Sequence, residues 1–272
     1  MPTEEEVMEG VSHWSCWWAN QRLKKLQNLA TETMSINPYI LGFLSEYHAL
    51  ESPKDLASHL ASFHLHIGHL TGFGKLVDEK IIPNVFGLIK LDKATRRERG
   101  LEDARFDAID HMLVHDDGEA TLFSQKSSKW TIQLSQAKEM NAAFFEIQQK
   151  DEWVRSIVVG ITYGNSGDMT DKYDIIRGIN RGANHEVYDL RDYVQSLVGR
   201  DFWAFINNGQ QETHLWVHRG FERGIADARL HERSQALLQE FQEAVAELFA
   251  GSLNIDGSIN HSLFLELVNT RQ

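Results

Sequence analysis

The residues best suited to chemistry lie in the middle of the chain and are Asp110, Ser124 and Lys126. A carboxylate such as that of Asp110 can hold a divalent cation, which polarises a phosphate and neutralises developing charge. A lysine such as Lys126 can orient or activate an attacking water and stabilise a pentavalent transition state. These residue types therefore predict metal-dependent hydrolysis of a phosphodiester.

A β-hairpin is expected to position these side chains. Apolar residues are frequent in 108–115 and 119–126, and the loop between them ends in a glycine that can adopt a left-handed conformation. If His115 and Glu119 close this three-residue loop, residues whose numbers sum to 234 face each other across the hairpin. One face then carries Asp110 opposite Ser124, Met112 opposite Leu122 and Val114 opposite Ala120, with Lys126 two residues beyond Ser124.

A second acidic metal ligand is expected two residues before the lysine, but that position is Ser124. Glu139 lies in a helix expected over 130–150, and folding of this helix over the hairpin would bring its carboxylate to Asp110. Glu119, at the far end of the hairpin, is a weaker alternative. An ordinary solvent-facing carboxylate is an equally weighted interpretation of Glu139.

The segments around the hairpin predict a mixed α/β fold. Residues 156–163 form a nearly continuous apolar run of strand length, which is typical of a central strand buried on both faces. A hairpin, a helix and a buried strand in succession indicate a central mixed sheet flanked by helices.

Both ends of the chain have helical patterns. Ser52 as N-cap and Pro53 at the first helical position begin one helix, expected to end near Ile67, and an apolar stripe predicts another from 222 to 249. Long amphipathic helices pack on each other or on a partner subunit. We expect a catalytic domain over 76–220 and a helical dimerisation subdomain formed by 1–75 and 221–272.

The composition excludes several classes of protein. The 272 residues include 27 Lys and Arg against 39 Asp and Glu, a formal net charge of -12, which argues against coating nucleic acid through bulk positive charge. A local basic surface remains compatible with this balance, because surface potentials decay over roughly 8–10 Å. The single cysteine, Cys16, excludes a disulfide framework. With an acidic start and no long apolar run, the sequence predicts a cytoplasmic protein without membrane contact.

Arginine side chains on either side of the catalytic segment are candidates for DNA contact. The segment 90–105 has six basic and four acidic residues, a local balance of +2, although a solvated loop would show the same charge. Arginine pairs bidentately with guanine in the major groove. The candidates are Arg96, Arg97 and Arg99 before the hairpin, and Arg177 and Arg181 after the buried strand.

A histidine cluster provides a rival metal site. It contains His59, His64, His66 and His69, and the last two have the spacing of a helical metal pair. No acidic residue completes the set, so packing or surface histidines are favoured over a zinc-dependent hydrolase. The glycines in 72–74 and 164–167 continue as neither a Walker nor a dinucleotide motif, so we expect turns and no nucleotide cofactor.

The pattern Asp110, Ser124-Gln125-Lys126 and Glu139 resembles the PD-(D/E)XK nuclease core of type II restriction endonucleases. It is similar to the variant in which the middle acid is serine and an acid has moved to a downstream helix. Ile109 stands where a proline often precedes the first aspartate. The length and much of the chain are also similar to restriction endonucleases that cleave the interrupted palindrome RGGNCCY.

The resemblance implies a restriction-endonuclease-like core in a homodimer that belongs to a restriction-modification system. It implies Mg²⁺-dependent hydrolysis of double-stranded DNA within that palindrome, leaving 5'-phosphate ends. Asp110 and Glu139 would bind the metal, Lys126 would act on the water, and Ser124 would support these groups without binding metal directly.

Two other interpretations remain open at the hairpin. Asp110 and Lys126 can form a cross-strand salt bridge on a half-exposed sheet, worth at most about 1 kcal/mol. A non-catalytic, sequence-specific DNA-binding dimer would use the same arginines without any chemistry.

Overall fold

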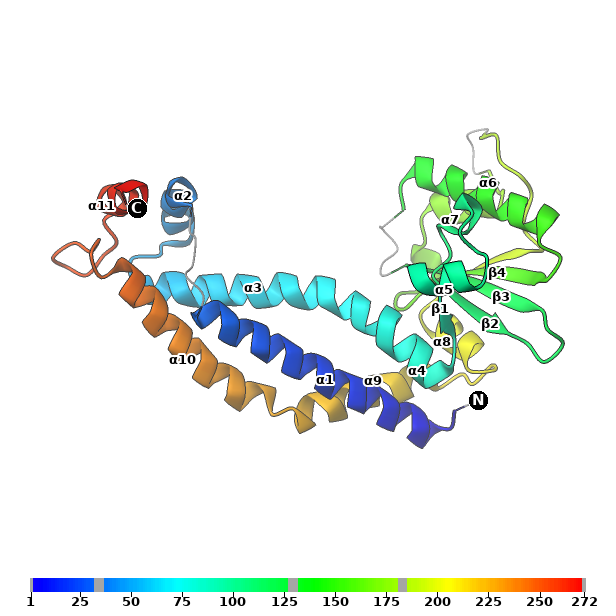
Figure 1. Ribbon diagram of the computed structural model, residues 1–272, viewed down its shortest axis with the longest axis horizontal. Helices are drawn as coiled ribbons and strands as arrows, with labels where there is room; N and C mark the ends of the chain where they lie inside the picture. Colours follow the sequence, from blue (N-terminus) through cyan, green and yellow to red (C-terminus); the bar gives the residue numbers. More distant parts are fainter. Residues whose placement is uncertain (1, 32–36, 127–131, 181–184, 271–272) are drawn as a thin grey trace. The chain divides into compact units, whose positions relative to one another are not determined.

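The computed structural model describes residues 2–31, 37–126, 132–180 and 185–270 (Figure 1). Within these ranges it leaves out the side chains of 26, 29–31, 64–71 and 168. The chain divides into two compact units, of which the first combines Met1–Trp14 with Gly74–Arg223 and the second combines Ser15–Phe73 with Gly224–Gln272. No helix in the described ranges is both long and apolar enough to cross a membrane.

The first unit is built on a five-stranded mixed sheet with the strand order β1-β2-β3-β4-β5. β1, β2 and β3 pair antiparallel, whereas β3, β4 and β5 pair parallel. The mixed α/β fold with a central mixed sheet is therefore confirmed. The strands are β1 (Ile89–Lys90), β2 (His111–Val114), β3 (Ala120–Lys126), β4 (Val154–Ile161) and β5 (Val194–Val198).

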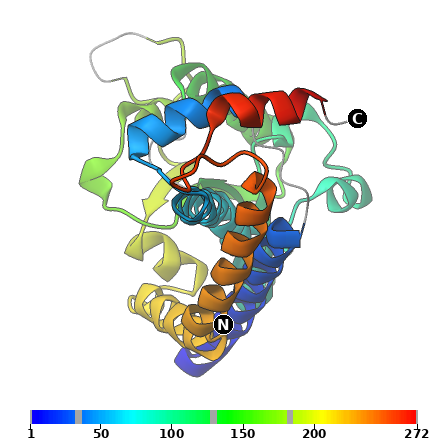
Figure 2. The ribbon, with the colours of Figure 1, turned by 90° about the vertical axis from the view of Figure 1, so that its left-hand side faces the viewer.

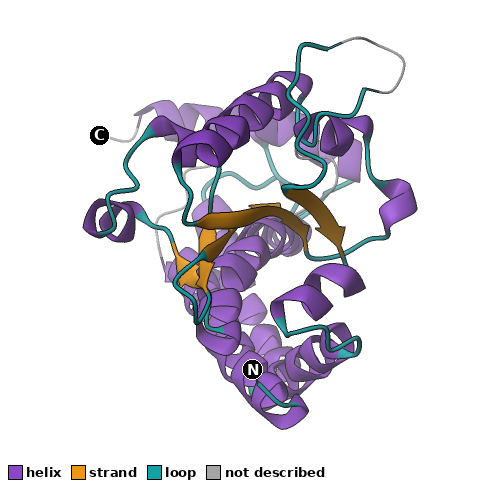
Figure 3. Cartoon of the chain, turned by 90° about the vertical axis from the view of Figure 1, so that its right-hand side faces the viewer, coloured by secondary structure: helices purple, strands orange, loops and turns teal. Residues whose placement is uncertain are grey.

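Helices cover both faces of this sheet (Figure 3). On one face, α6 (Leu134–Lys150) and α7 (Asp171–Ile176) join the core that contains Leu122 and Val159. On the other face, α8 (Arg200–Ile206) places Phe202 so close to Gly160 that a Cβ at Gly160 would lie 2.3 Å from the ring. The shorter elements are η1 (Val77–Ile81), α4 (Ile82–Phe86), α5 (Lys93–Glu98), η2 (Ala104–Phe106) and η3 (Ser166–Asp168).

The hairpin of β2 and β3 has the predicted register. Met112 pairs with Leu122, and Val114 pairs with Ala120. The His115 amide donates to the Glu119 carbonyl at 2.8 Å, which closes the three-residue loop. Gly118 has a φ of 86°, the left-handed conformation expected of the loop glycine.

The second unit is helical and has its own core. Its helices are α2 (Pro38–His48), α10 (Leu230–Phe249), α11 (His261–Thr270) and most of α3 (Pro53–Leu76), with α2 and α11 side by side (Figure 2). The core contains Leu41, Leu56, Ala57, Ala61, Phe241, Val245, Phe249, Ile259 and Phe264. α1 (Glu4–Thr31) and α9 (Thr213–Asp227), like α3, contribute residues to both units.

The helix start at Ser52 is confirmed. Ser52 Oγ accepts a hydrogen bond from the Asp55 backbone amide at 3.2 Å, and Asp55 Oδ2 accepts one from the Ser52 backbone amide at 3.2 Å. The two side chains therefore cap the backbone N–H groups reciprocally. The predicted end near Ile67 is wrong, because α3 continues to Leu76.

Two boundaries differ from the sequence expectation. The helix predicted over 222–249 is broken into α9 and α10, because Arg229 takes a left-handed conformation with a φ of 49°. Residues Met1–Trp14 cluster with the sheet-bearing unit. They do so because Val11 is fully buried there and packs so closely on Gly220 that a Cβ at the glycine would lie 2.6 Å from Val11 Cβ.

Candidate functional site

Three charged residues, Asp78, Lys90 and Asp110, meet near the open end of the hairpin, and together with Lys126 at the end of β3 we call them the charged cluster. Lys90 Nζ lies 2.6 Å from Asp78 Oδ2 and 3.9 Å from Asp110 Oδ1. The charges of both carboxylates act on Lys126. Asp78 comes from η1, Lys90 from β1, Lys126 from the end of β3, and Asp110 directly precedes β2.

Hydrogen bonds to the hairpin backbone fix the position of Asp110. Its Oδ2 accepts from the Gln125 amide at 2.7 Å, and its own amide donates to the Phe123 carbonyl at 2.7 Å. The other carboxylate oxygen, Oδ1, faces Lys90. One oxygen is therefore used to orient the group, while the second is available to the charged cluster.

The pKa of Lys126 is lowered. Burial is the largest cause, and the positive charge of Lys90 acts in the same direction, while Asp110 and Asp78 raise the pKa. Loss of hydration therefore outweighs attraction by the two carboxylates. A lysine in this setting is neutral at a lower pH than a lysine in water, which suits it to proton transfer.

His111 fixes the turn that carries Asp78. The ring is fully buried, and its Nε2 donates to the Asp78 carbonyl at 2.8 Å. Burial and the charge of Lys90 lower the pKa of His111. A neutral ring is thus favoured, and it ties η1 to β2 so that Asp78 reaches the cluster.

Buried polar atoms around the cluster lack hydrogen-bond partners among the residues that the structure describes. They are Asp78 Oδ1, His111 Nδ1, Ser124 Oγ and Gln125 Oε1. Such atoms are rare in folded proteins, where buried polar groups are normally paired with protein or water. Asp78 and the immediate neighbours of Asp110 and Lys126 thus retain unused polar atoms that a polar ligand could contact.

The residues of this site fit a magnesium ion. Mg²⁺ usually binds proteins through one or two carboxylates and keeps several of its waters. Asp78 and Asp110 supply two carboxylates close to one ammonium group. In the described part of the chain, no group of three or more His, Cys, Asp or Glu residues is placed to hold a metal. Asp78 and Asp110 are therefore the residues that would hold such an ion, with water completing its coordination.

Glu139 lies on the exposed side of α6. The buried stripe of α6 includes Ala137, Met140 and Phe144, which pack on the sheet, and Glu139 is exposed. Within the described residues, no hydrogen bond or ion pair joins it to the charged cluster. Glu119 is engaged at the turn, where Arg155 Nε donates to its Oε2 at 2.8 Å. Asp78, which the sequence analysis missed, is the second carboxylate near Asp110.

Arg96 is used inside the protein. Its guanidinium donates from Nε to the Leu91 carbonyl at 2.9 Å, and from its two terminal nitrogens to the carbonyls of Phe106 at 2.6 Å and Ile109 at 2.5 Å. The Ile109 carbonyl belongs to the peptide unit whose amide is that of Asp110. Arg96 therefore holds the backbone that carries Asp110, and these bonds leave its guanidinium committed to the protein.

The Arg96→Ala variant is expected to lower the free energy of unfolding by about 2–6 kcal/mol, because the Leu91 and Ile109 carbonyls lose this donor at roughly 1–3 kcal/mol each. The Phe106 carbonyl still accepts from the Ile109 amide. Urea unfolding would measure this loss. Arg97→Ala is the matched control, since that exposed side chain pairs only loosely with Glu102, with Nε 3.5 Å from Oε1. A loss at Arg96 as small as the control's would contradict the structural role.

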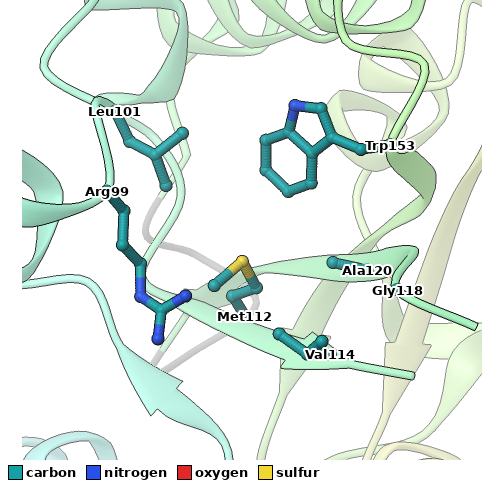
Figure 4. A pocket seen from close by; sticks show the side chains of 7 residues that line it. All are labelled: Arg99, Leu101, Met112, Val114, Gly118, Ala120 and Trp153. Carbon is teal, nitrogen blue, oxygen red and sulfur yellow. The ribbon is translucent and has the colours of Figure 1, made fainter. Parts of the chain in front are cut away.

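The remaining arginine candidates have different surroundings. Arg97 is exposed, and Arg177 Nε donates to the Val194 carbonyl at 3.2 Å. Arg181 lies outside the described residues. Arg99 borders a pocket of about 250 Å³ whose other walls are mainly apolar (Figure 4). The lining residues are Arg99, Leu101, Met112, Val114, Gly118, Ala120 and Trp153.

The histidine cluster is only partly within the described residues. The ring centroids of His59 and His48 lie 4.0 Å apart, and burial followed by the charge of His48 lowers the pKa of His59. The side chains of His64, His66 and His69 are outside the description, so the predicted pair at 66 and 69 remains a prediction.

Comparison with known proteins identifies no relative from which the function of the site could be inferred. No protein-family model matches the chain, and no curated protein sequence matches it.

Proposed function

We propose that the chain is a Mg²⁺-dependent endonuclease that hydrolyses double-stranded DNA at a specific palindromic site and leaves 5'-phosphate ends. The observation that carries the proposal is the charged cluster, in which Lys126, with its lowered pKa, lies under the influence of two carboxylates. The pattern around Asp110 and Lys126 resembles the catalytic core of type II restriction endonucleases. We extend that resemblance to a PD-(D/E)XK fold, a restriction-modification system and the site RGGNCCY.

The side chains of the cluster have separate tasks in this proposal. Asp110 and Asp78 hold the metal ion, which would polarise the scissile phosphate and neutralise charge that develops on it. Lys126 accepts a proton from the attacking water in its neutral form and stabilises negative charge in its protonated form. The backbone N–H of Gln125 orients the Asp110 carboxylate by donating a hydrogen bond to it.

Asp78 and Glu139 are alternative candidates for the second carboxylate that binds the metal, and replacing them is expected to have different effects. Asp78→Asn is expected to slow cleavage by about a hundredfold or more and to raise the Mg²⁺ concentration needed, because the site loses one of its anionic groups. Glu139→Gln is expected to change neither, since that side chain is exposed on α6. Magnesium titrations of the cleavage rate measure both effects. The reverse result would favour Glu139 over Asp78 as the metal ligand.

The partner in this proposal is double-stranded DNA. Arg97 and Arg99 are exposed near the hairpin and remain available as contacts, whereas Arg96 is committed to backbone carbonyls. A net charge of -12 weakens non-specific attraction to DNA. Base contacts in a matched site must then supply much of the affinity. DNA cleavage of this kind requires no nucleotide cofactor and fits a cytoplasmic enzyme.

A homodimer follows from the need to cut both strands of a palindrome. Two-fold symmetry presents one copy of the site to each strand. The second unit offers an apolar surface on α2, where Tyr39, Ile40, Phe43 and Tyr47 are between 53% and 86% exposed. We assign the contact between copies to this surface, which we call the α2 stripe.

The test of the proposed function is incubation of the whole protein with a long mixed-sequence DNA, with Mg²⁺ or with EDTA. Discrete fragments that form only with Mg²⁺ support it, and sequencing of their ends tests the RGGNCCY site. Intact DNA in the presence of folded, dimeric protein would reject it. Sequence-specific DNA binding that is unchanged in Lys126→Ala, without cleavage by either protein, would favour the non-catalytic dimer.

A further inference from the structure

The ammonium group of Lys90 lies within 4 Å of two carboxylates of the charged cluster. Its Nζ is 2.6 Å from Asp78 Oδ2 and 3.9 Å from Asp110 Oδ1. These are the two carboxylates that the proposed function assigns to the metal. The same pair of anions is thus already neutralised in part by a side chain of the protein.

The local structure brings Lys90 to this position. β1 has only two residues, and in it Lys90 pairs with His111 at the start of β2. The next amide, that of Leu91, donates to the Asp110 carbonyl at 2.9 Å. The backbone of Lys90 is therefore fixed beside Asp110, while its four-carbon side chain can move the ammonium group.

Electrostatics give this ammonium two opposite effects. Without a cation, the carboxylates of Asp78 and Asp110 would repel each other, and Lys90 relieves that repulsion. When a divalent cation approaches the same carboxylates, the charge of Lys90 repels it. Lys90 must then move away or give up its contact with Asp78.

We propose that Lys90 is an internal counter-ion that occupies the carboxylate pair in the metal-free protein and competes with Mg²⁺ for it. This inference rests on the proposed function only in assigning a divalent cation to Asp78 and Asp110. Lys90 acts through the carboxylates and sets the cation concentration at which the site fills.

The experiment measures binding of Mg²⁺ and of Ca²⁺ to the full chain without DNA by isothermal titration calorimetry. Lys90→Gln removes the charge but keeps a hydrogen-bond donor for Asp78, and it is expected to bind both ions at least tenfold more tightly than the wild type. Lys93→Gln is the matched control, because Lys93 is an exposed residue at the start of α5. It is expected to bind like the wild type, and Asp110→Asn is expected to lose binding.

Thermal unfolding provides a second readout that does not depend on activity. Without metal, Lys90→Gln is expected to melt at a lower temperature than the wild type, because the two carboxylates lose their counter-ion. Added Ca²⁺ is expected to raise its midpoint by more than it raises that of the wild type. Lys90→Met, which also removes the charge, serves the same comparison if the glutamine variant does not fold.

The outcomes separate this inference from the proposed function. Equal or weaker ion binding by the neutral Lys90 variants overturns the inference, even if the wild type cleaves DNA. Tighter binding by these variants supports it, even if the wild type leaves DNA intact, in which case the nuclease proposal alone is rejected. No ion binding by either the wild type or the variants overturns the inference and removes the metal site.

Discussion

Lys126→Met is expected to slow DNA cleavage by about a hundred- to ten-thousandfold while leaving the protein at least as stable as the wild type. General acid–base groups contribute roughly this much to rate. Burial lowers the pKa of Lys126 more than the nearby carboxylates raise it, so the folded protein disfavours the charged form. Methionine keeps the length of the side chain and removes that unfavourable charge.

The dependence of stability on pH follows from the same shift. Because the folded pKa of Lys126 lies below its usual value of 10.5, the unfolded chain binds the proton more readily. This group therefore makes stability rise with pH between its folded pKa and 10.5, and its contribution is lost as pH falls. Lys126→Met is expected to flatten that part of the profile, as measured by urea unfolding across pH.

Lys138→Met is the control for this change, because Lys138 is exposed on α6. It should cut DNA at the wild-type rate. Full cleavage by Lys126→Met would remove Lys126 from the mechanism. A large drop in its thermal midpoint would instead show that Lys126 is needed to hold the fold.

Replacing Phe43 and Tyr47 with aspartate is expected to turn a dimer into monomers and double-strand cleavage into slow nicking. The two rings are 79% and 86% exposed and lie one helical turn apart on α2, where each would be buried by a second copy. Aromatic residues central to interfaces typically contribute about 2 kcal/mol or more each. Two such losses weaken association by about a thousandfold.

Sedimentation equilibrium measures the mass, and a supercoiled plasmid distinguishes nicked circles from linear DNA. Ile255→Asp is the matched control, since this residue is also fully exposed in the helical unit but lies outside the α2 stripe. We expect the control to remain dimeric. A dimeric Phe43→Asp/Tyr47→Asp protein would show that the copies meet elsewhere.

The hairpin was predictable because its signals are local. Alternation in two short segments and a glycine at the end of the loop determine which residues face each other, and Met112 and Leu122 pair as expected. The N-cap at Ser52 was predictable for the same reason, since its partner Asp55 is three residues away.

The rest of the site depends on contacts that no local pattern reveals. Asp78 lies in a π-helical turn and Lys90 in a two-residue strand, and both are too short to produce a periodic signal. Arginine is a residue type that often contacts DNA, which is why Arg96 was a candidate. Its guanidinium instead binds backbone carbonyls that lie up to 13 residues away in the sequence, at Ile109. The exposure of Glu139 on α6 was not predictable either, because the sequence indicates the helix but not its rotation on the sheet.

The order of the strands has a consequence for synthesis. Each strand pairs with the strand that precedes it in the chain, so the sheet has no strand that must wait for a distant segment. The whole charged cluster lies between Asp78 and Lys126 and can therefore assemble while later residues are still being translated. The helical unit, in contrast, is complete only when Gly224–Gln272 has left the ribosome. In the proposed endonuclease, the residues assigned to the chemistry would thus be made before the helical unit to which the contact between copies is assigned is complete.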